Sequence, residues 1–270
     1  MTEKGTTEWS GYHPAKDRLR ALVWARLQSQ GATVSDPVGH IPRFVGVDQA
    51  AARLAMLPVW HQASVIKCNP DAAQAPVRLR ALQDGKVLYM AVPRLTRPRC
   101  FVQLTAADLQ RQGIALEIAA FHRGAMQHGQ LVGFAEMRLI DLVVVGCVAV
   151  ADDGGRTGKG AGFADLELGM LRQLGLVQAE TPIVTTVHPL QIVGSGQLPM
   201  LAHDWSLSWI VTPEEAIATQ RPRPQPPGLL WDQVRPTQYA TIPILWTLRS
   251  DGSAAARQAG VMSPEAEDHG

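Results

Sequence analysis

Apolar and polar positions along this chain follow two alternating patterns, one typical of helices and one typical of strands. Apolar side chains recur at helical spacing between Pro14 and Gly31, where the pattern stops, and this predicts a helix. A second helix is expected from about Asp48, a residue that suits an N-cap. A third helix is expected to end at Gly85, and Thr105 leads a fourth. Each of these segments is followed or preceded by a short apolar run.

The apolar runs are rich in β-branched residues and predict strands. They read ASVIKC, KVLYMAVP, LVVVGCVAV, PIVTTV and LSWIV. The unbroken run at residues 142–150 predicts one central strand covered on both faces. Further helices are expected over residues 163–174 and from the TPEE sequence at residues 212–215. This alternation predicts an α/β fold with a mostly parallel central sheet flanked by helices, in a Rossmann-like three-layer arrangement.

The composition of the chain divides it into three parts. Residues 1–13 resemble a flexible leader, and residues 14–220 carry the strand and helix pattern of one α/β domain. Residues 221–270 form a Pro-rich extension that is expected to pack partly on the domain, with a disordered tail from about residue 250. The RPRPQPPG stretch predicts a linker, with a recognition segment as the alternative.

Charge, hydropathy and cysteine usage restrict the expected partners and location. The 25 basic and 24 acidic residues balance to +1, so neither nucleic acid nor a membrane is expected as a partner. The polar N-terminus lacks an apolar signal region and no apolar run approaches ~20 residues, so a cytoplasmic location is expected. Cys68, Cys100 and Cys147 lie far apart without a C-x-x-C pair and are interpreted as buried apolar residues.

A glycine-rich segment, DDGGRTGKGAGFAD at residues 152–165, lies between the long apolar run and a predicted helix. From residue 156 onward, its glycines and cations are Arg156, Gly158, Lys159, Gly160 and Gly162. The glycines would let successive backbone N–H groups approach an anion, and the helix would direct its positive end to the same place. The segment matches neither a Walker A motif nor the dinucleotide fingerprint. It predicts a phosphate-binding loop, with a tight turn that holds no ligand as the alternative.

Three charged residues could complete this loop. Asp165 lies on the first turn of the predicted helix, where a carboxylate beside phosphates could hold Mg²⁺ and where a surface acid is the alternative. Lys16 and Arg20 are four residues apart on the first predicted helix, so both can project from one face. Taken alone, they are also consistent with two solvated charges on an amphipathic helix.

Four segments together resemble the 5-formyltetrahydrofolate cyclo-ligase family. RTGKGAGFAD at residues 156–165 is similar to the family loop R-x-G-x-G-x-G-[YF]-x-D, and AKDRLR supplies the Lys and Arg of the family's first helix. LPMLAHDWSLSWIVTP resembles the closing L-P-x-x-x-H-D segment, and RLRALQDGKVLYMAVPRL a helix–strand unit. The resemblance covers roughly residues 14–220. Within the family, GKGAGFADLELGML, TTVHPLQIV and RPRPQPPGLLW are most similar to the branch named for a methenyltetrahydrofolate synthetase domain.

The resemblance implies a ligase that uses ATP and Mg²⁺ to convert 5-formyltetrahydrofolate to 5,10-methenyltetrahydrofolate, with a reduced folate as its small-molecule substrate. Either a monomer or a homodimer is expected. The residues implied for ATP binding are Lys16, Arg20, Arg156, Gly158, Lys159, Gly160, Ala161, Gly162 and Phe163. Arg156 and Lys159 are the implied catalytic residues, Asp165 and Asp204 the implied metal ligands, and Cys68 and Phe163 the implied substrate contacts.

The sequence departs from the family pattern in the part implied to bind folate. Ala164 stands where a second aromatic residue is usual, and Leu166 where an Arg often follows the Asp. The acidic residue expected after the strand near Cys68 is replaced by Ala73, and Asp71 is expected to be out of register. Two alternatives therefore stay open: an ATP-dependent ligase or kinase acting on another metabolite, and a non-catalytic nucleotide- or folate-binding protein.

Two histidines near these segments, His188 and His203, could act as acid–base groups. No Ser, Cys or carboxylate partner lies at a telling spacing from either of them. His188 is expected at a strand end, packing near the site. His203 is expected to orient the carboxylate of Asp204.

Overall fold

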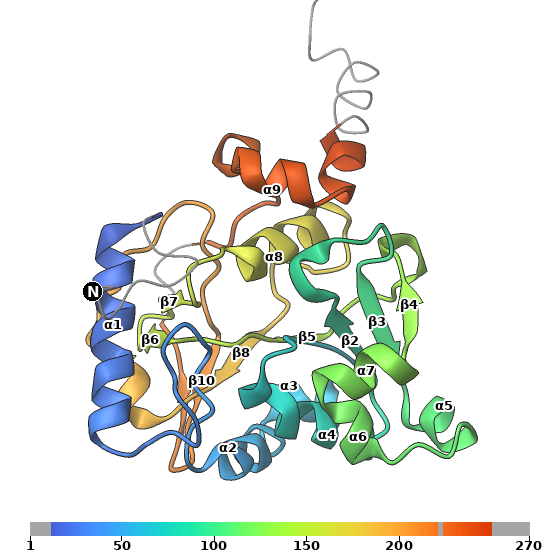
Figure 1. Cartoon of the computed structure of the whole chain (residues 1–270), viewed down its shortest axis with the longest axis horizontal. Coiled ribbons are helices and arrows are strands. Elements are labelled where there is room, and N and C mark those ends of the chain that lie inside the picture. The colour runs from blue at the N-terminus through green and yellow to red at the C-terminus, as the bar shows by residue number, and fades with distance from the viewer. Residues whose placement is uncertain (1–11, 221–223, 250–270) are drawn as a thin grey trace, which may run out of the picture.

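The computed structural model describes residues 12–220 and 224–249. Most of the predicted leader and the predicted tail from about residue 250 lie outside the described residues. Figure 1 shows a central sheet between two helical layers, with a further helix and a small sheet at one side. Among the helices of the described residues, none combines the length and the hydropathy that crossing a bilayer would require.

An eight-stranded sheet forms the centre of the molecule, in the order β11-β10-β8-β5-β1-β2-β3-β4. Its five central strands are parallel: β10 (Trp209–Val211), β8 (Ile183–Thr186), β5 (Leu142–Val144), β1 (Val65–Cys68) and β2 (Val87–Ala91). Antiparallel strands extend the edges: β11 (Ala216–Ala218), β3 (Phe101–Leu104) and β4 (Gln130–Val132). The predicted α/β fold with a mostly parallel sheet is confirmed.

Helices cover both faces of this sheet. One layer contains α2 (Val47–Leu54), α3 (Pro58–Gln62), α4 (Ala75–Gln83), α6 (Leu116–Ala120) and α7 (His122–His128), with α5 (Ala106–Arg111) near the β3 edge. The other layer contains α8 (Phe163–Gln173), above which α9 (Pro236–Thr241) lies in Figure 1. The first helix, α1 (Pro14–Ser29), packs on a second sheet of β7 (Arg156–Thr157), β6 (Ala149–Ala151) and β9 (Ile192–Val193).

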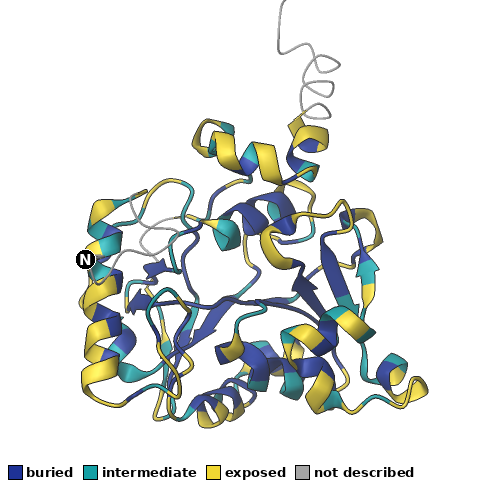
Figure 2. Ribbon diagram, in the orientation of Figure 1, coloured by how far each residue is buried: buried dark blue, intermediate teal, exposed yellow. Residues whose placement is uncertain are grey.

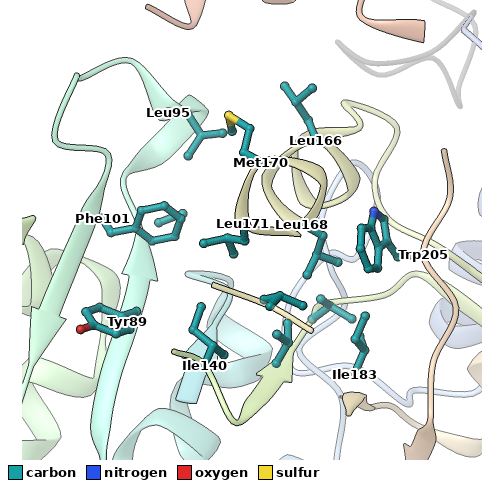
Figure 3. Packing of buried hydrophobic residues seen from close by; sticks show 14 of the residues in the cluster. Tyr89, Leu95, Phe101, Ile140, Leu166, Leu168, Met170, Leu171, Ile183 and Trp205 are labelled. Atoms are coloured by element: carbon teal, nitrogen blue, oxygen red, sulfur yellow. The ribbon is translucent and has the colours of Figure 1, made fainter. Parts of the chain in front are cut away.

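Strand alternation distributes the apolar side chains between two core layers. In β5, Val143 packs in the cluster that includes α8, whereas Leu142 and Val144 pack in the cluster that includes α2 and α4. Figure 3 shows Leu168 and Leu171 of α8 pointing toward the sheet. Burial of each such leucine contributes roughly 1.5–3 kcal/mol. The five central strands are accordingly mostly dark blue in Figure 2, while the outer faces of the helices are yellow.

The apolar run at residues 142–150 forms two strands in two different sheets, so the prediction of one strand is wrong. β5 ends at Val144 and β6 begins at Ala149. At Gly146, a Cβ would lie 2.9 Å from Asp71 Oδ2 and 3.0 Å from Gln74 Oε1. The backbone therefore passes closely over the turn that follows β1, and it leaves the central sheet there.

The structure also differs from the helix starts expected at Asp48 and at residues 212–215. The N-cap of α2 is Gly46, whose φ is +90°, and Asp48 lies in the first turn. Residues 212–215 form a turn in which the Thr212 hydroxyl accepts from the Glu215 N–H at 3.0 Å. This turn joins β10 to the antiparallel β11. A local side-chain to backbone hydrogen bond thus replaces the expected helix.

The described part of the Pro-rich extension, residues 224–249, lies against α8. It contains the short turn η5 (Trp231–Gln233), then α9, and residues 244–249 are again helical. Ile242, Leu245 and Leu248 are buried in the same apolar cluster as Leu168. The extension therefore contributes to the core beside α8.

The three cysteines are buried and unpaired, and their chemistry gives a first prediction. Burial raises the pKa of Cys68 to about 11 and that of Cys100 to about 12, and burial also raises the pKa of Cys147. At pH 8 a thiol of pKa about 11 is ionised in only about one molecule in a thousand. We expect no thiol to react with an aromatic disulfide reagent at pH 8 in the folded protein, and all three to react in denaturant. A thiol titrating within seconds before unfolding would contradict this.

Candidate functional site

The topology of the sheet locates the site at the carboxyl ends of β1 and β5. After β1 the chain crosses to β2 on one side, and after β5 it crosses to β8 on the other, so the two strands flank a topological switch point. Ligands of open α/β sheets bind in the crevice at such a point. A cavity of about 1110 Å³ opens there, lined by Asn69 and Asp71 after β1 and by Gly146 after β5.

The glycine-rich loop forms one wall of this cavity. β7 ends at Thr157, α8 begins at Phe163, and the loop between them has positive φ at Gly160 (+115°) and Gly162 (+74°). The backbone N–H groups of residues 158–162 donate to no other described residue. Consecutive uncommitted N–H groups at the start of an 11-residue helix can bind an anion.

Two of the cations of α1, Lys16 and Arg20, also face the cavity, and both are buried. Arg20 donates from Nη1 to Thr157 Oγ1 at 2.7 Å and forms an ion pair with Asp17. Lys16 Nζ lies 2.5 Å from Asp204 Oδ2. The alternative interpretation of these residues as solvated charges does not hold, because α1 carries them into the cavity wall beside the loop.

Arg156, Asp165 and Asp204 are linked by one short segment of backbone. Arg156 forms an ion pair with Asp165 and donates from Nε to the Trp205 carbonyl at 2.8 Å. Asp165 Oδ1 also accepts from the Trp205 N–H at 3.0 Å, next to Asp204 in the chain. Burial alone would lower the pKa of Arg156, but the nearby Asp165, Cys147 and Asp204 together outweigh burial and the pKa is raised. The guanidinium is therefore permanently charged.

The two carboxylates suit a cation that is shared with phosphates. Both line the cavity. Hydrogen bonds engage Oδ1 of Asp165 and Oδ2 of Asp204, which leaves for a cation Oδ2 of Asp165 and Oδ1 of Asp204, the latter 3.8 Å from His203 Nε2. In the described ranges, no group of three or more His, Cys, Asp or Glu could hold a metal ion alone. Mg²⁺ is commonly bound by one or two carboxylates with phosphate and water completing its shell, so these residues fit it.

All the residues implied for nucleotide and metal binding line the same cavity, although residue 16 and residue 204 are far apart in sequence. They are Lys16, Arg20, Arg156, Gly158, Lys159, Gly160, Ala161, Gly162, Phe163, Asp165 and Asp204. Among the described residues, eight Lys and Arg side chains and four Asp and Glu side chains line it. The excess of cations favours an anionic ligand.

The residues near β1 that were expected to contact the substrate do not all line the cavity. Cys68 is fully buried in the layer of α2 and α4 and does not line the cavity, because alternation along β1 turns it to that face. Asp71, expected to be out of register, does line the cavity, and its Oδ1 lies 3.3 Å from Lys159 Nζ. Ala73 is buried in the apolar cluster beside α1. Phe163 lines the cavity as expected.

Of the two histidines, His188 and His203, one lies outside the cavity lining and the other is part of it. His188 caps a short turn, where its Nδ1 accepts from the Leu190 N–H at 3.2 Å and its ring packs edge-on to Phe44. His188 lies outside the cavity lining. His203 lines the cavity, with Nε2 3.8 Å from Asp204 Oδ1.

Sequence reasoning missed a buried ion pair that joins the sheet to α8. Lys67 of β1 and Glu167 of α8 form this pair, with side-chain exposures of 0% and 5%, and Glu167 reaches the cavity wall. Burial raises the pKa of Glu167, and the Lys67 ammonium opposes that effect. A lysine inside the apolar run ASVIKC and an acid beside the buried Leu168 were the available signals.

Arg78 is a second buried cation that was missed. Its Nε donates to the Ala120 carbonyl at 2.7 Å, and its Nη1 donates to the carbonyls of Asn69 and Asp71. It therefore fixes the turn after β1 to the end of α6.

Comparison with known proteins decides the family. The model of the 5-formyltetrahydrofolate cyclo-ligase family matches residues 13–213. The chain belongs to this family. The resemblance found in the sequence is thereby confirmed, and the expectation of a ligase enzyme agrees with cyclo-ligase membership.

Two methenyltetrahydrofolate synthase domain-containing proteins that are similar to this chain are longer than it. The methenyltetrahydrofolate synthase domain-containing protein of Mus musculus is 38% identical over 245 residues, which cover 90% of this chain and 65% of that protein. The Homo sapiens protein of the same name is 37% identical over 248 residues, covering 91% and 63%. The chain thus spans less than two thirds of the length of these relatives. The NMR structure of Aquifex aeolicus 5,10-methenyltetrahydrofolate synthetase is 18% identical, with a TM-score of 0.47, and covers 76% of this chain and 95% of that chain.

Proposed function

We propose that this chain catalyses the ATP- and Mg²⁺-dependent conversion of 5-formyltetrahydrofolate to 5,10-methenyltetrahydrofolate. Membership of the cyclo-ligase family supports the reaction class. The observation that carries the proposal is the cavity itself, where five uncommitted loop N–H groups at residues 158–162 lie with four implied phosphate-binding cations and two carboxylates. Such a wall suits a triphosphate and its metal.

The reaction requires activation of a poor leaving group. A formamide oxygen does not depart readily, so ATP would first phosphorylate it, with ADP as the product of that step. The neighbouring N10 amine would then attack the formyl carbon, inorganic phosphate would leave, and the five-membered ring would close. The protein would contribute positioning and charge neutralisation rather than a covalent intermediate.

The described contacts support a role for each cation. Lys16 and Arg20 would anchor the nucleotide, because α1 brings both to the loop. Lys159 has the more exposed side chain and would reach the transferred phosphoryl group, whereas the buried Arg156 would hold Asp165 in place. Asp165 and Asp204 would hold Mg²⁺, which when bound would neutralise charge on the phosphate oxygens.

Turnover of the expected substrate tests this proposal directly. Purified protein incubated with ATP, Mg²⁺ and 5-formyltetrahydrofolate is expected to give equimolar ADP and methenyltetrahydrofolate. The absorbance of methenyltetrahydrofolate and a coupled ADP assay measure the two products. Omission of ATP or of the folate is the control and is expected to give neither product. Saturable ATP binding without ADP release in any folate mixture would contradict the proposal and would favour a non-catalytic binding protein.

A second candidate is an ATP-dependent ligase or kinase that acts on another metabolite. It is favoured by the absence of a carboxylate at Ala73, which is buried in the core, and by the pairing of Asp71 with Lys159. ADP release with a different formyl-amine or carboxyl-bearing compound, but not with 5-formyltetrahydrofolate, would select this candidate.

A further inference from the structure

Part of the cavity wall lies beyond residue 213, where the family match ends. Seven residues between 228 and 238 line the cavity, and they come from the segment that precedes and begins α9. Two of them, Arg235 and Gln238, directly contact the glycine-rich loop.

Arg235 and Gln238 converge on one carbonyl of that loop. Arg235 donates from Nη2 to the Ala161 carbonyl, and Gln238 donates from Nε2 to the same oxygen at 3.4 Å. The two residues are also joined to each other, because the Arg235 N–H donates to Gln238 Oε1 at 2.9 Å. Gln238 is buried, with 7% of its surface exposed. The pair therefore forms a preassembled clamp on Ala161.

The peptide unit that the clamp holds, between Ala161 and Gly162, helps to set the direction of the loop N–H groups. Ala161 lies between Gly160 and Gly162, which both have positive φ. Because glycine has no side chain, the backbone on either side of Ala161 has few conformational restraints of its own. Because a peptide unit is planar and trans, a fixed Ala161 carbonyl also fixes the opposite direction of the Gly162 N–H. Gly162 is the N-cap of α8, so the clamp sets the start of the helix as well.

The clamp rests on a firmly packed support. Leu229 packs so closely on α8 that a Cβ at Gly169 would lie 3.1 Å from its Cδ2. Ile242, Leu245 and Leu248 continue the same segment into the core. The Arg235 guanidinium lies 3.9 Å from the centre of the Tyr12 ring, which gives it a second restraint through a cation–π contact.

We propose that Arg235, with Gln238, is a positioning residue for the nucleotide: by holding the Ala161 carbonyl it orders the loop N–H groups before the triphosphate binds. This inference rests on the proposed ATP binding. An unordered loop with three glycines would have to lose conformational entropy on binding, and a loop already held by the clamp would lose less. The effect belongs to nucleotide affinity, because neither side chain has been placed on the reacting atoms.

Steady-state kinetics of three variants test the inference. Arg235→Ala is expected to raise KM for ATP about tenfold with little change in kcat, a size typical of one lost hydrogen bond from a charged donor. Gln238→Ala is expected to raise it less, and Arg235→Lys to restore part of the loss because it retains a charged donor. Arg249→Ala is the matched control: this arginine lies on the same segment and over a tyrosine ring, Tyr239, but does not line the cavity.

Hydrogen exchange of the nucleotide-free protein separates this inference from the proposed function. Amides of residues 158–162 are expected to exchange faster in Arg235→Ala than in the wild type, and at an unchanged rate in Arg249→Ala. If wild-type protein fails to bind Mg·ATP, the proposed function is wrong, while the exchange comparison still tests the clamp. Unchanged loop exchange and unchanged KM in both Arg235→Ala and Gln238→Ala would overturn the inference. If Arg235→Ala fails to fold by circular dichroism, Arg235→Lys and Gln238→Ala decide the matter.

Discussion

Replacement of Glu167 by glutamine is expected to lower the free energy of unfolding by about 3–5 kcal/mol, because it leaves the ammonium of Lys67 buried without a counter-charge. The Lys67 side chain is fully buried in β1, and its other partner, Asn69 Oδ1 at 2.5 Å, carries no charge. Chemical denaturation monitored by circular dichroism measures the change. The double variant Lys67→Met, Glu167→Leu is expected to recover most of the loss, since it removes both charges and keeps the side-chain volume.

An exposed pair of the same kind provides the control for that measurement. Arg99 and Glu136 form an ion pair whose side chains are 57% and 40% exposed. Glu136→Gln is expected to change the free energy of unfolding far less than Glu167→Gln does, because solvent screens the charges of an exposed pair. Equal losses in Glu136→Gln and Glu167→Gln would show that burial of the Lys67–Glu167 pair is not what makes it important.

Replacement of Lys16 by alanine is expected to reduce kcat/KM for ATP on the order of 10²- to 10³-fold, comparable to the loss in kcat when one preorganised hydrogen-bond donor is removed from an active site. Lys16 lies on the α1 face that meets the loop, and it also neutralises the buried carboxylate of Asp204. The ADP assay with saturating folate measures the effect.

Arg18 offers a matched control on the same helix. It is two residues from Lys16, exposed, and outside the cavity lining. Arg18→Ala is expected to retain wild-type kcat/KM, and circular dichroism is expected to give the same helix content for both variants. Full activity of Lys16→Ala would remove α1 from the proposed nucleotide site.

Local chemistry was sufficient to predict the elements whose ends are set by their own residues. The helix led by Thr105 exists because the Thr105 hydroxyl accepts from the Asp108 N–H at 3.1 Å, a contact encoded within four residues. The loop after Thr157 was recognisable because glycines and cations at its spacing have a direct chemical meaning. These features depend on neighbours in sequence.

Features that depend on distant residues were not predictable. An apolar run has the same appearance whether it forms one strand or two, and the division near Gly146 is imposed by its contact with Asp71 and Gln74. Cys68 is turned away from the cavity because alternation along β1 places its side chain in the layer of α2 and α4. The pairing of Lys67 with Glu167 joins residues a hundred positions apart, and only the layered fold brings them together.

The shared packing of α8 has a consequence for how the molecule unfolds. The apolar face of this helix is divided between the central sheet and the segment that carries Leu229, Ile242 and Leu245, all in one continuous cluster. Two regions that bury each other's apolar surface melt in a single cooperative transition. We therefore expect the cooperatively unfolding unit to extend past residue 213, where the family match ends, with its border set by the packing around α8 rather than by sequence similarity.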